Sequence, residues 1–214
     1  MNGINIILIT TLLVLLIFKK PCSKVEKFKD VYSNLNYLSK IVWINLDRSP
    51  ERRSYMDRLL ELCNVNNERI SAVDGKNFDV FSILGNLRTV PQYKDFYNGK
   101  VIYRKMKTSE VGCTLSHIKA INLLNNEPGE YFMICEDDIS FENLVYFPNT
   151  SLEKIIKNAP DFEILILNKI MNKSLKNEYT LWNEKLEAYG TACYLITKKG
   201  VNKIINICKY NNGN

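Results

Sequence analysis

The sequence of 214 residues has a single histidine, His117, and its six cysteines include no C-x-x-C pair. A structural zinc site built from paired cysteines and histidines is therefore not expected, because such sites take closely spaced ligands. A serine triad would have to use His117, since no other imidazole is present to act as the base. The sequence also lacks internal repeats and low-complexity tracts, and we expect one globular domain.

The charged residues form no long run of one sign. The formal net charge is +6, but lysine and arginine are spread along the chain and interleaved with acidic residues. A nucleic-acid surface would gather them in one run or on one face, so we expect no nucleic-acid partner. A mild positive excess also suits an anionic ligand such as a pyrophosphate.

The cysteines are scattered, and three of them, Cys113, Cys135 and Cys193, stand in apolar contexts. We expect these three as buried free thiols, which pack as small hydrophobic groups. Disulfides are the alternative if the domain lies in an oxidising compartment.

Residues 4–18 form an apolar run that only Asn5, Thr10 and Thr11 interrupt, and lysines follow it at once. As a helix rising about 1.5 Å per residue it would span roughly 22 Å, less than the ~30 Å hydrocarbon core, which fits a short membrane anchor. A cleaved signal peptide is the alternative, but Lys19-Lys20-Pro21 is a poor cleavage context. We expect an anchor or signal segment over residues 1–20, a polar tether over residues 21–39 and the globular domain over residues 40–214.

Short apolar runs rich in β-branched and aromatic residues predict the strands of a buried sheet. These predicted strands cover residues 41–44, 69–73, 131–135, 163–167 and 189–196. Residues 76–107 contain Pro91 and Gly99, and we expect a long irregular region there.

Three apolar patterns with helical spacing predict helices. Ser49-Pro50-Glu51 supplies a cap, a first-turn proline and a first-turn acid for a helix that reaches Cys63. Two further patterns predict helices over residues 109–125 and 198–209. The residues expected to face the core are Met56, Leu59, Leu60 and Cys63 in the first helix, Val111, Leu115, Ile118, Ile121 and Leu124 in the second, and Val201, Ile204, Ile205 and Cys208 in the third. Alternating strands and helices predict an α/β sandwich with a mostly parallel central sheet.

Three consecutive acids, Glu136, Asp137 and Asp138, directly follow the apolar strand over residues 131–135. Ligands of open α/β sheets bind outside the carboxyl ends of the strands, which is where this triplet would lie. Like charges this close need a compensating cation, and Mg²⁺ and Mn²⁺ both suit carboxylate oxygens. Alternation along an extended chain would let Glu136 and Asp138 share the metal while Asp137 points the other way. The alternative is a solvated acidic turn.

Basic residues follow the first predicted strand. Arg48 lies at its exit, and Arg52 and Arg53 lie in the first turns of the next helix. Arginines near a crevice are suited to clamp phosphates. Exposed arginines paired with Glu51 or Asp57 are an equally weighted alternative. His117 is expected as a structural core histidine, with a role as a ligand to donor or acceptor as the second interpretation.

Five motifs occur in a fixed order along the chain. They are Ile44-Asn45-Leu46-Asp47-Arg48 with Glu51-Arg52-Arg53, Ala72-Val73-Asp74-Gly75, Glu110-Val111-Gly112-Cys113 with Leu115-Ser116-His117, Glu136-Asp137-Asp138, and Tyr189-Gly190-Thr191-Ala192-Cys193-Tyr194-Leu195-Ile196. In this order and spacing the motifs resemble glycosyltransferase family 25, which contains lipooligosaccharide and collagen hydroxylysine galactosyltransferases. The resemblance runs from about residue 40 to the end.

The resemblance implies a GT-A type fold, a UDP-sugar donor (typically UDP-galactose), an inverting transfer of a hexose and a divalent metal, Mn²⁺ or Mg²⁺. It implies that Asn45, Asp47, Arg48 and Arg52 line the donor's nucleotide side and that Asp74, Gly75, Ser116 and His117 line the rest of the donor site. Glu136 and Asp138 would then hold the metal, with Asp137 and Asp138 in the catalytic machinery.

The acceptor side is less determined by the sequence. An inverting transfer needs a carboxylate base, and Glu184 and Glu187 are candidates, although solvated turn residues are the more frequent role for such glutamates. Glycans, lipid-linked saccharides and collagen-like proteins are all open as acceptors. Family members usually continue past the last motif, so a truncated, membrane-tethered paralogue that binds nucleotide or glycan without turnover is the alternative function.

The sequence does not decide the membrane or the orientation. The lysines after the apolar run would keep the domain cytoplasmic, whereas eukaryotic sugar transferases face the lumen. A membrane of the ER/Golgi type and the bacterial inner membrane both stay open.

Overall fold

The computed structural model describes residues 6–9, 35, 37–63, 65–76, 92–97, 100–141, 151–167, 179–181 and 190–211. The order of the main sheet is β3-β2-β6-β9-β7-β1-β8, and β4 pairs with β5 in a separate hairpin. The strands of the main sheet are β1 (Ile6–Ile9), β2 (Lys40–Asn45), β3 (Asn67–Ser71), β6 (Tyr131–Glu136), β7 (Ile164–Ile166), β8 (Tyr179–Leu181) and β9 (Cys193–Thr197). The sequence's prediction of a mixed α/β domain is confirmed, and the arrangement is compatible with a Rossmann-like fold.

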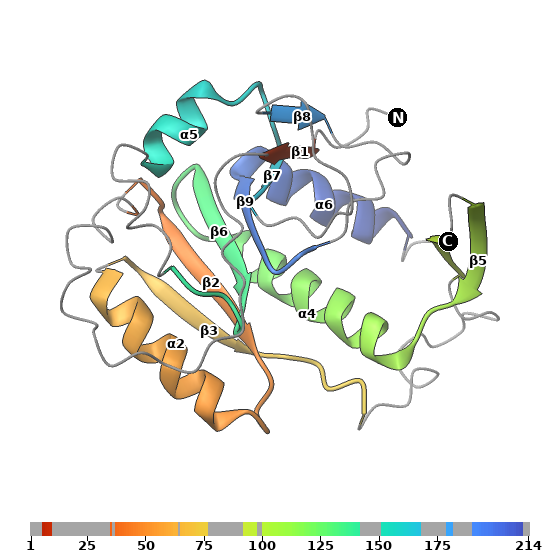
Figure 1. Cartoon of the computed structure of the whole chain (residues 1–214). Coiled ribbons are helices and arrows are strands. Elements are labelled where there is room, and N and C mark those ends of the chain that lie inside the picture. Colours follow the sequence, from red (N-terminus) through yellow and green to blue (C-terminus); the bar gives the residue numbers. More distant parts are fainter. Residues whose placement is uncertain are drawn as a thin grey trace.

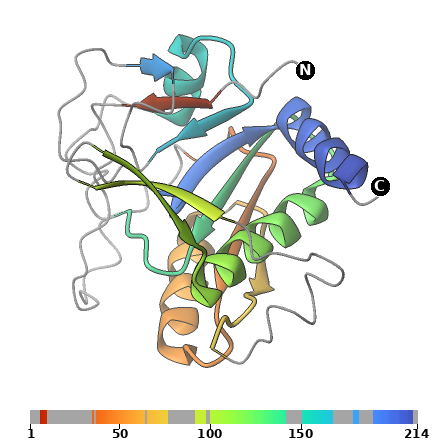
Figure 2. The ribbon, with the colours of Figure 1, turned by 90° about the vertical axis from the view of Figure 1, so that its right-hand side faces the viewer.

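Helices cover both faces of this sheet (Figure 1). The helices are α2 (Pro50–Cys63), α4 (Thr108–Leu124), α5 (Leu152–Asn158) and α6 (Lys198–Asn211). In Figure 2, α4 and α6 lie side by side on one face of the sheet, in agreement with their mutual contacts. The result is a three-layer sandwich, and the helices predicted to end at Cys63 and to start near Ser109 and at Lys198 are confirmed.

The period-two alternation of the strands divides the core into two halves. In β2, Ile41 and Trp43 face the layer of α2 and α5, whereas Val42 and Ile44 face the layer of α4 and α6. All four side chains are buried, as expected for a strand covered on both faces. The predicted inner face of α2, which is Met56, Leu59, Leu60 and Cys63, is buried as well.

The sheet is mixed rather than mostly parallel, which corrects the prediction. Strand β2 pairs parallel to β3 and β6, and β1 pairs parallel to β7. Strand β9, however, lies antiparallel between β6 and β7, and β8 is antiparallel to β1. The physical reason is that hydrophobic runs report burial on both faces, and Tyr194, Leu195 and Ile196 are equally buried whichever way β9 runs.

A second correction concerns residues 76–107, for which we expected irregular structure. They contain an antiparallel hairpin of β4 (Gln92–Tyr97) and β5 (Lys100–Lys105) that leads directly into α4 (Figure 1). The longest apolar run in QYKDFY and KVIYRK is Val101-Ile102-Tyr103, and Ile102 and Tyr103 are exposed, so β5 does not show the burial of a core strand. The two strands are paired along their whole length.

The N-terminal segment also differs from the sequence's prediction. Four residues of the expected membrane helix, Ile6–Ile9, form β1 at the sheet, paired with β7 and β8. The β-branched isoleucines of this stretch suit a strand as well as an apolar helix. Within the described residues, no helix has the length and apolar character that crossing a membrane requires. The remainder of residues 4–18 lies outside the described residues, and membrane attachment stays a prediction.

Candidate active site

The carboxyl ends of three parallel strands meet at one edge of the sheet. The ladder places Asn45 of β2 opposite Ser71 of β3, and Ile44 opposite Glu136 of β6. The ends of these strands and the chain segments that leave them carry three of the five sequence motifs. The strand register therefore brings these three motifs to the carboxyl edge, where open α/β sheets bind their ligands.

A cavity of about 210 Å³ opens at this edge. Its wall includes predicted donor and metal residues, namely Arg48, Arg52, Asp74, Gly75, Ser116, His117, Glu136 and Asp137. Lys76, Ser109 and Cys113, which the sequence did not predict as donor or metal residues, also line it. Pockets that enclose a drug-sized ligand measure roughly 300–1,000 Å³, so this cavity has room for only part of a ligand of that size.

Asp137 is held in place by two partners from the first motif. The side-chain amide of Asn45 donates to Oδ2 of Asp137 at 2.6 Å, and Arg52 donates to Oδ1 at 2.9 Å. Asn45 and Asp137 are both buried, with 1% and 8% of their surface exposed. Asn45 thus lies behind the cavity wall, where it orients a carboxylate rather than meeting a ligand.

Asp138 has the opposite character. Its Oδ1 atom is buried and has no hydrogen-bond partner among the described residues. Arg52 approaches its other oxygen only to 3.7 Å. Burial and the neighbouring Glu136 raise the pKa of Asp138 above its ordinary value. A buried carboxylate oxygen without a partner is a natural acceptor for a cation or a donor group that the protein itself does not supply.

Glu136 faces helix α4 and the start of β9. Its Oε1 lies 3.4 Å from Nε2 of His117 and accepts a hydrogen bond from Thr191 at 3.2 Å. The contact with His117 lowers the pKa of Glu136 despite the opposing effect of burial. The other ring nitrogen of His117 lies 3.1 Å from the hydroxyl of Tyr194. His117 is therefore a buried histidine, as the sequence favoured, and it also forms part of the cavity wall.

Asp47 and Arg48 take different places. Asp47 is largely exposed and accepts hydrogen bonds from Arg69 and from Ser71, the latter at 2.6 Å. It is absent from the residues that line the cavity. Arg48 reaches Asp74 at 2.6 Å and remains half exposed at the cavity wall. Arg69, which the sequence did not single out, also donates to Asn45 at 2.9 Å, so it braces the first motif from β3.

Helix α4 and the loop after β3 form one continuous wall. Ser116 Oγ accepts a hydrogen bond from the backbone of Val73 at 2.8 Å and donates to the carbonyl of Gly112 at 2.7 Å. Ser116 thus fixes the loop, and its hydroxyl proton is already donated within the protein.

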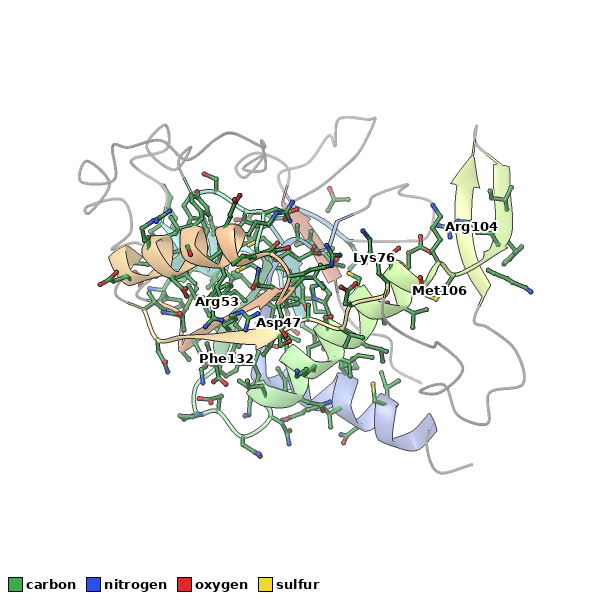
Figure 3. All side chains as sticks on the ribbon, turned by 90° about the horizontal axis from the view of Figure 1, so that it is seen from below. Asp47, Arg53, Lys76, Arg104, Met106 and Phe132 are labelled. Carbon is green, nitrogen blue, oxygen red and sulfur yellow. The ribbon has the colours of Figure 1, made fainter. Side chains whose placement is uncertain are left out.

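Two basic side chains lie near the start of α4. Figure 3 shows Lys76 on the loop after β3, beside α4, and Arg104 on the hairpin. Arg104 makes a two-pronged ion pair with Glu110, which lowers the pKa of that carboxyl to about 2.

The close approach of this wall requires glycine at position 112. A Cβ there would lie 2.6 Å from the carbonyl oxygen of Val73, well inside van der Waals contact. We expect Gly112→Ala to lower the free energy of unfolding by about 1–3 kcal/mol, as overpacking does. Urea denaturation measures this loss, and Asn122→Ala, an exposed change on the same helix, should stay within about 0.5 kcal/mol of wild type. A Gly112→Ala protein as stable as wild type would contradict the contact.

The environment of His117 predicts a pH dependence of stability. Burial disfavours the charged ring, but Cys113 and Glu136 outweigh it and raise the pKa of His117 to about 9. Because the unfolded value is near ~6.5, the stabilisation is fully present below about pH 6.5 and is lost as the pH rises towards about 9. In a chelating buffer, wild type should therefore lose more unfolding free energy than His117→Gln across that window. Parallel pH profiles of the two proteins would refute the assignment.

Two sequence-based expectations need correction, and a third concerns residues outside the described part. Cys135 and Cys193 are buried free thiols as predicted, but Cys113 is exposed. The inner face of α4 is rotated relative to the apolar pattern, with Ser116 and His117 buried and Leu115 and Ile118 only half-buried. Glu184 and Glu187, the candidate bases, lie outside the described residues.

The fold and the cavity together define an α/β protein with arginines and clustered acids around a cavity at the carboxyl edge of its parallel strands. The family model described as "Glycosyltransferase family 25 (LPS biosynthesis protein)" matches residues 38–212. The chain belongs to glycosyltransferase family 25.

Curated relatives agree with this membership. A glycosyltransferase 25 family member of Drosophila melanogaster is 31% identical over 178 residues, which cover 78% of this chain and 28% of that protein. Procollagen galactosyltransferase 2 of Homo sapiens is 27% identical over 176 residues, covering 78% of this chain and 27% of that protein. The chain thus spans less than a third of the length of these relatives.

Proposed function

We propose that this chain is a GT-A type glycosyltransferase that moves a hexose, galactose in the first place, from a UDP-sugar to an acceptor hydroxyl with inversion. Its family membership and relatives named as procollagen galactosyltransferases support a galactosyl transfer. The single observation that carries the proposal is the difference in hydrogen bonding between Asp137 and Asp138. Asp137 is fixed by Asn45 and Arg52, whereas Asp138 keeps a buried oxygen without a partner among the described residues.

The residues present fit a divalent metal. No described residue is a hydrogen-bond partner of Asp138 Oδ1, and the preceding Glu136 adds a second carboxylate, so the two supply the oxygen ligands that Mg²⁺ and Mn²⁺ prefer. The ion, when bound, neutralises charge on the diphosphate leaving group. Asp137 is held by Arg52 and would keep the backbone of the triplet in place, so that Glu136 and Asp138 stay in position for the metal.

Basic side chains at the cavity wall would bind the diphosphate. Arg48, Arg52 and Lys76 line the cavity, and the two arginines are already oriented by Asp74 and Asp137. A guanidinium oriented in this way can donate two parallel hydrogen bonds to a phosphate without first being ordered. The positive charge also attracts an anionic donor to the cavity from solution.

The transfer itself needs one displacement at the anomeric carbon. The acceptor oxygen forms the new bond to that carbon while the bond to the diphosphate oxygen breaks, and the acceptor proton passes to a carboxylate base. The acceptor hydroxyl is proposed to belong to a glycan, a lipid-linked saccharide or a collagen-like protein. The family description and the names of the relatives point to these classes.

Calorimetric titration of the full chain with UDP-galactose and UDP-glucose, with and without Mn²⁺, tests the donor site. We expect binding that depends on Mn²⁺ and favours UDP-galactose, followed by release of UDP when an acceptor is added. An Asp161→Asn protein serves as the matched control, because Asp161 is an exposed acid away from the cavity. Metal-dependent binding without turnover on any acceptor class would instead favour a module that binds nucleotide only. A folded protein that ignores both sugars would refute the proposal.

A further inference from the structure

A second set of metal-binding atoms converges on the same cavity. Cys113 and His117 lie one turn apart on α4, and Glu136 ends strand β6. One sulfur, one imidazole nitrogen and one carboxylate oxygen of these residues all lie within 4.8 Å of one another. Residues four apart on a helix share a face, so α4 presents the sulfur and the imidazole together to the strand end.

The chemistry of this set differs from that of the acid triplet. Mg²⁺ and Mn²⁺ favour oxygen ligands, whereas thiolate, imidazole and carboxylate together are ligands of Zn²⁺. A thiolate and a carboxylate also balance the two positive charges of the ion. Three protein ligands leave the fourth tetrahedral position open, and all three residues line the cavity, so that position would face its interior.

The separation between His117 and Glu136 fits a small ion. Bonds of about 2.0–2.3 Å at tetrahedral angles place neighbouring ligand atoms roughly 3.3–3.6 Å apart. The observed separation of 3.4 Å between His117 Nε2 and Glu136 Oε1 lies in this range. Cys113 is exposed, so its side chain has room to turn towards the ion, and the ion has a path from solvent.

The groups around the ligands are arranged as an outer shell should be. Nδ1 of His117 lies 3.1 Å from the buried hydroxyl of Tyr194, which leaves Nε2 for the ion. Thr191 donates to the carboxylate of Glu136 at 3.2 Å and holds it towards His117. Such partners fix the ring orientation of a metal-binding histidine and raise the affinity of the site.

We propose that Cys113, His117 and Glu136 bind Zn²⁺ within the cavity and that the occupied site blocks sugar transfer. The ion takes Glu136 away from the oxygen-ligand pair with Asp138 and occupies space at the cavity wall. The binding stands on the geometry alone, whereas the inhibition rests on the proposed function.

Cobalt serves as the spectroscopic probe for the binding. Adding Co²⁺ to the reduced full chain should produce a thiolate-to-metal charge-transfer band, which Zn²⁺ then abolishes by displacement. Cys113→Ser should lose the band, and its Zn²⁺ affinity should fall more than about tenfold, because even outer-shell changes typically cost 10–100-fold. Cys208→Ser is the matched control, since Cys208 is a partly exposed cysteine on α6, and it should keep both. Thermal unfolding of both variants in chelator verifies that they fold.

A band that persists in Cys113→Ser, or that disappears equally in Cys208→Ser, overturns the site. For the inhibition, Zn²⁺ is titrated into a transfer reaction at fixed Mn²⁺, and half-inhibition should need at least about tenfold more Zn²⁺ in Cys113→Ser. Equal sensitivity of the two proteins overturns the inhibitory role. Absence of transfer under every condition would refute the proposed function while leaving the spectroscopic result intact.

Discussion

Asp138→Asn is expected to slow sugar transfer at least about a hundredfold, because a preorganised charge at a reacting centre typically contributes a factor of 10²–10³. The substitution keeps the shape of the side chain and removes only its charge. The buried Oδ1 atom would lose its ability to hold a cation, and Mn²⁺-dependent donor binding should weaken in parallel. Initial rates of UDP release, measured over a range of Mn²⁺ concentrations, give both quantities.

The control for this experiment is Asp161→Asn, which removes an exposed acid paired with Lys199 and should leave the rate unchanged. Because the raised pKa of Asp138 reflects its burial and the charge of Glu136, the neutral side chain should not destabilise the fold. A variant that transfers sugar at the wild-type rate with the same Mn²⁺ dependence would remove Asp138 from the site.

Phe132→Ala is expected to lower the free energy of unfolding by about 3–5 kcal/mol, the usual cost of truncating a buried phenylalanine. Phe132 lies in β6, has no exposed surface and packs against the α4 and α6 layer. The ammonium group of Lys198 lies 5.9 Å from the centre of its ring. Urea denaturation followed by circular dichroism measures the change.

Tyr103→Ala provides the comparison, since Tyr103 is 66% exposed on the hairpin and its removal should change stability by less than about 0.5 kcal/mol. Because β6 ends at the acid triplet, the internal void left by Phe132→Ala should also disturb the triplet and weaken donor binding. Equal stability of the two variants would mean that the layer beneath α4 and α6 is not the core described above.

The parts of the fold that the sequence predicted are those in which periodicity and burial coincide. In α2, four apolar residues at helical spacing face the core, and the cap residues mark its start. In α4 the same reasoning was right for Val111, Ile121 and Leu124 but wrong for Leu115 and Ile118, because close packing rather than hydrophobicity selects some of the inward residues. Gly112 and Ser116 face inward where the loop after β3 approaches the helix, and Cys113, next to Gly112, is exposed.

The candidate site shows the same limit. The acid triplet and the arginines could be predicted, because each stands at the end of an apolar strand or the start of a helix. Thr191 and Tyr194 could not be given their contacts, since these depend on β9 lying antiparallel beside β6. The direction of β9 depends on the topology of the chain, and a local pattern of hydrophobic residues carries no information about it.

The hydrogen bonds between the loop after β3 and helix α4 have a consequence for binding thermodynamics. Val73 is tied to Ser116, and Lys76 donates its backbone N–H to Asp74, which Arg48 also holds. A wall that is already ordered loses little conformational entropy when a ligand arrives, so more of the contact energy remains as affinity. Donor binding to this side of the cavity should therefore need little rearrangement of the loop. Its association rate should depend on solvent viscosity and on charge rather than on a slow loop motion.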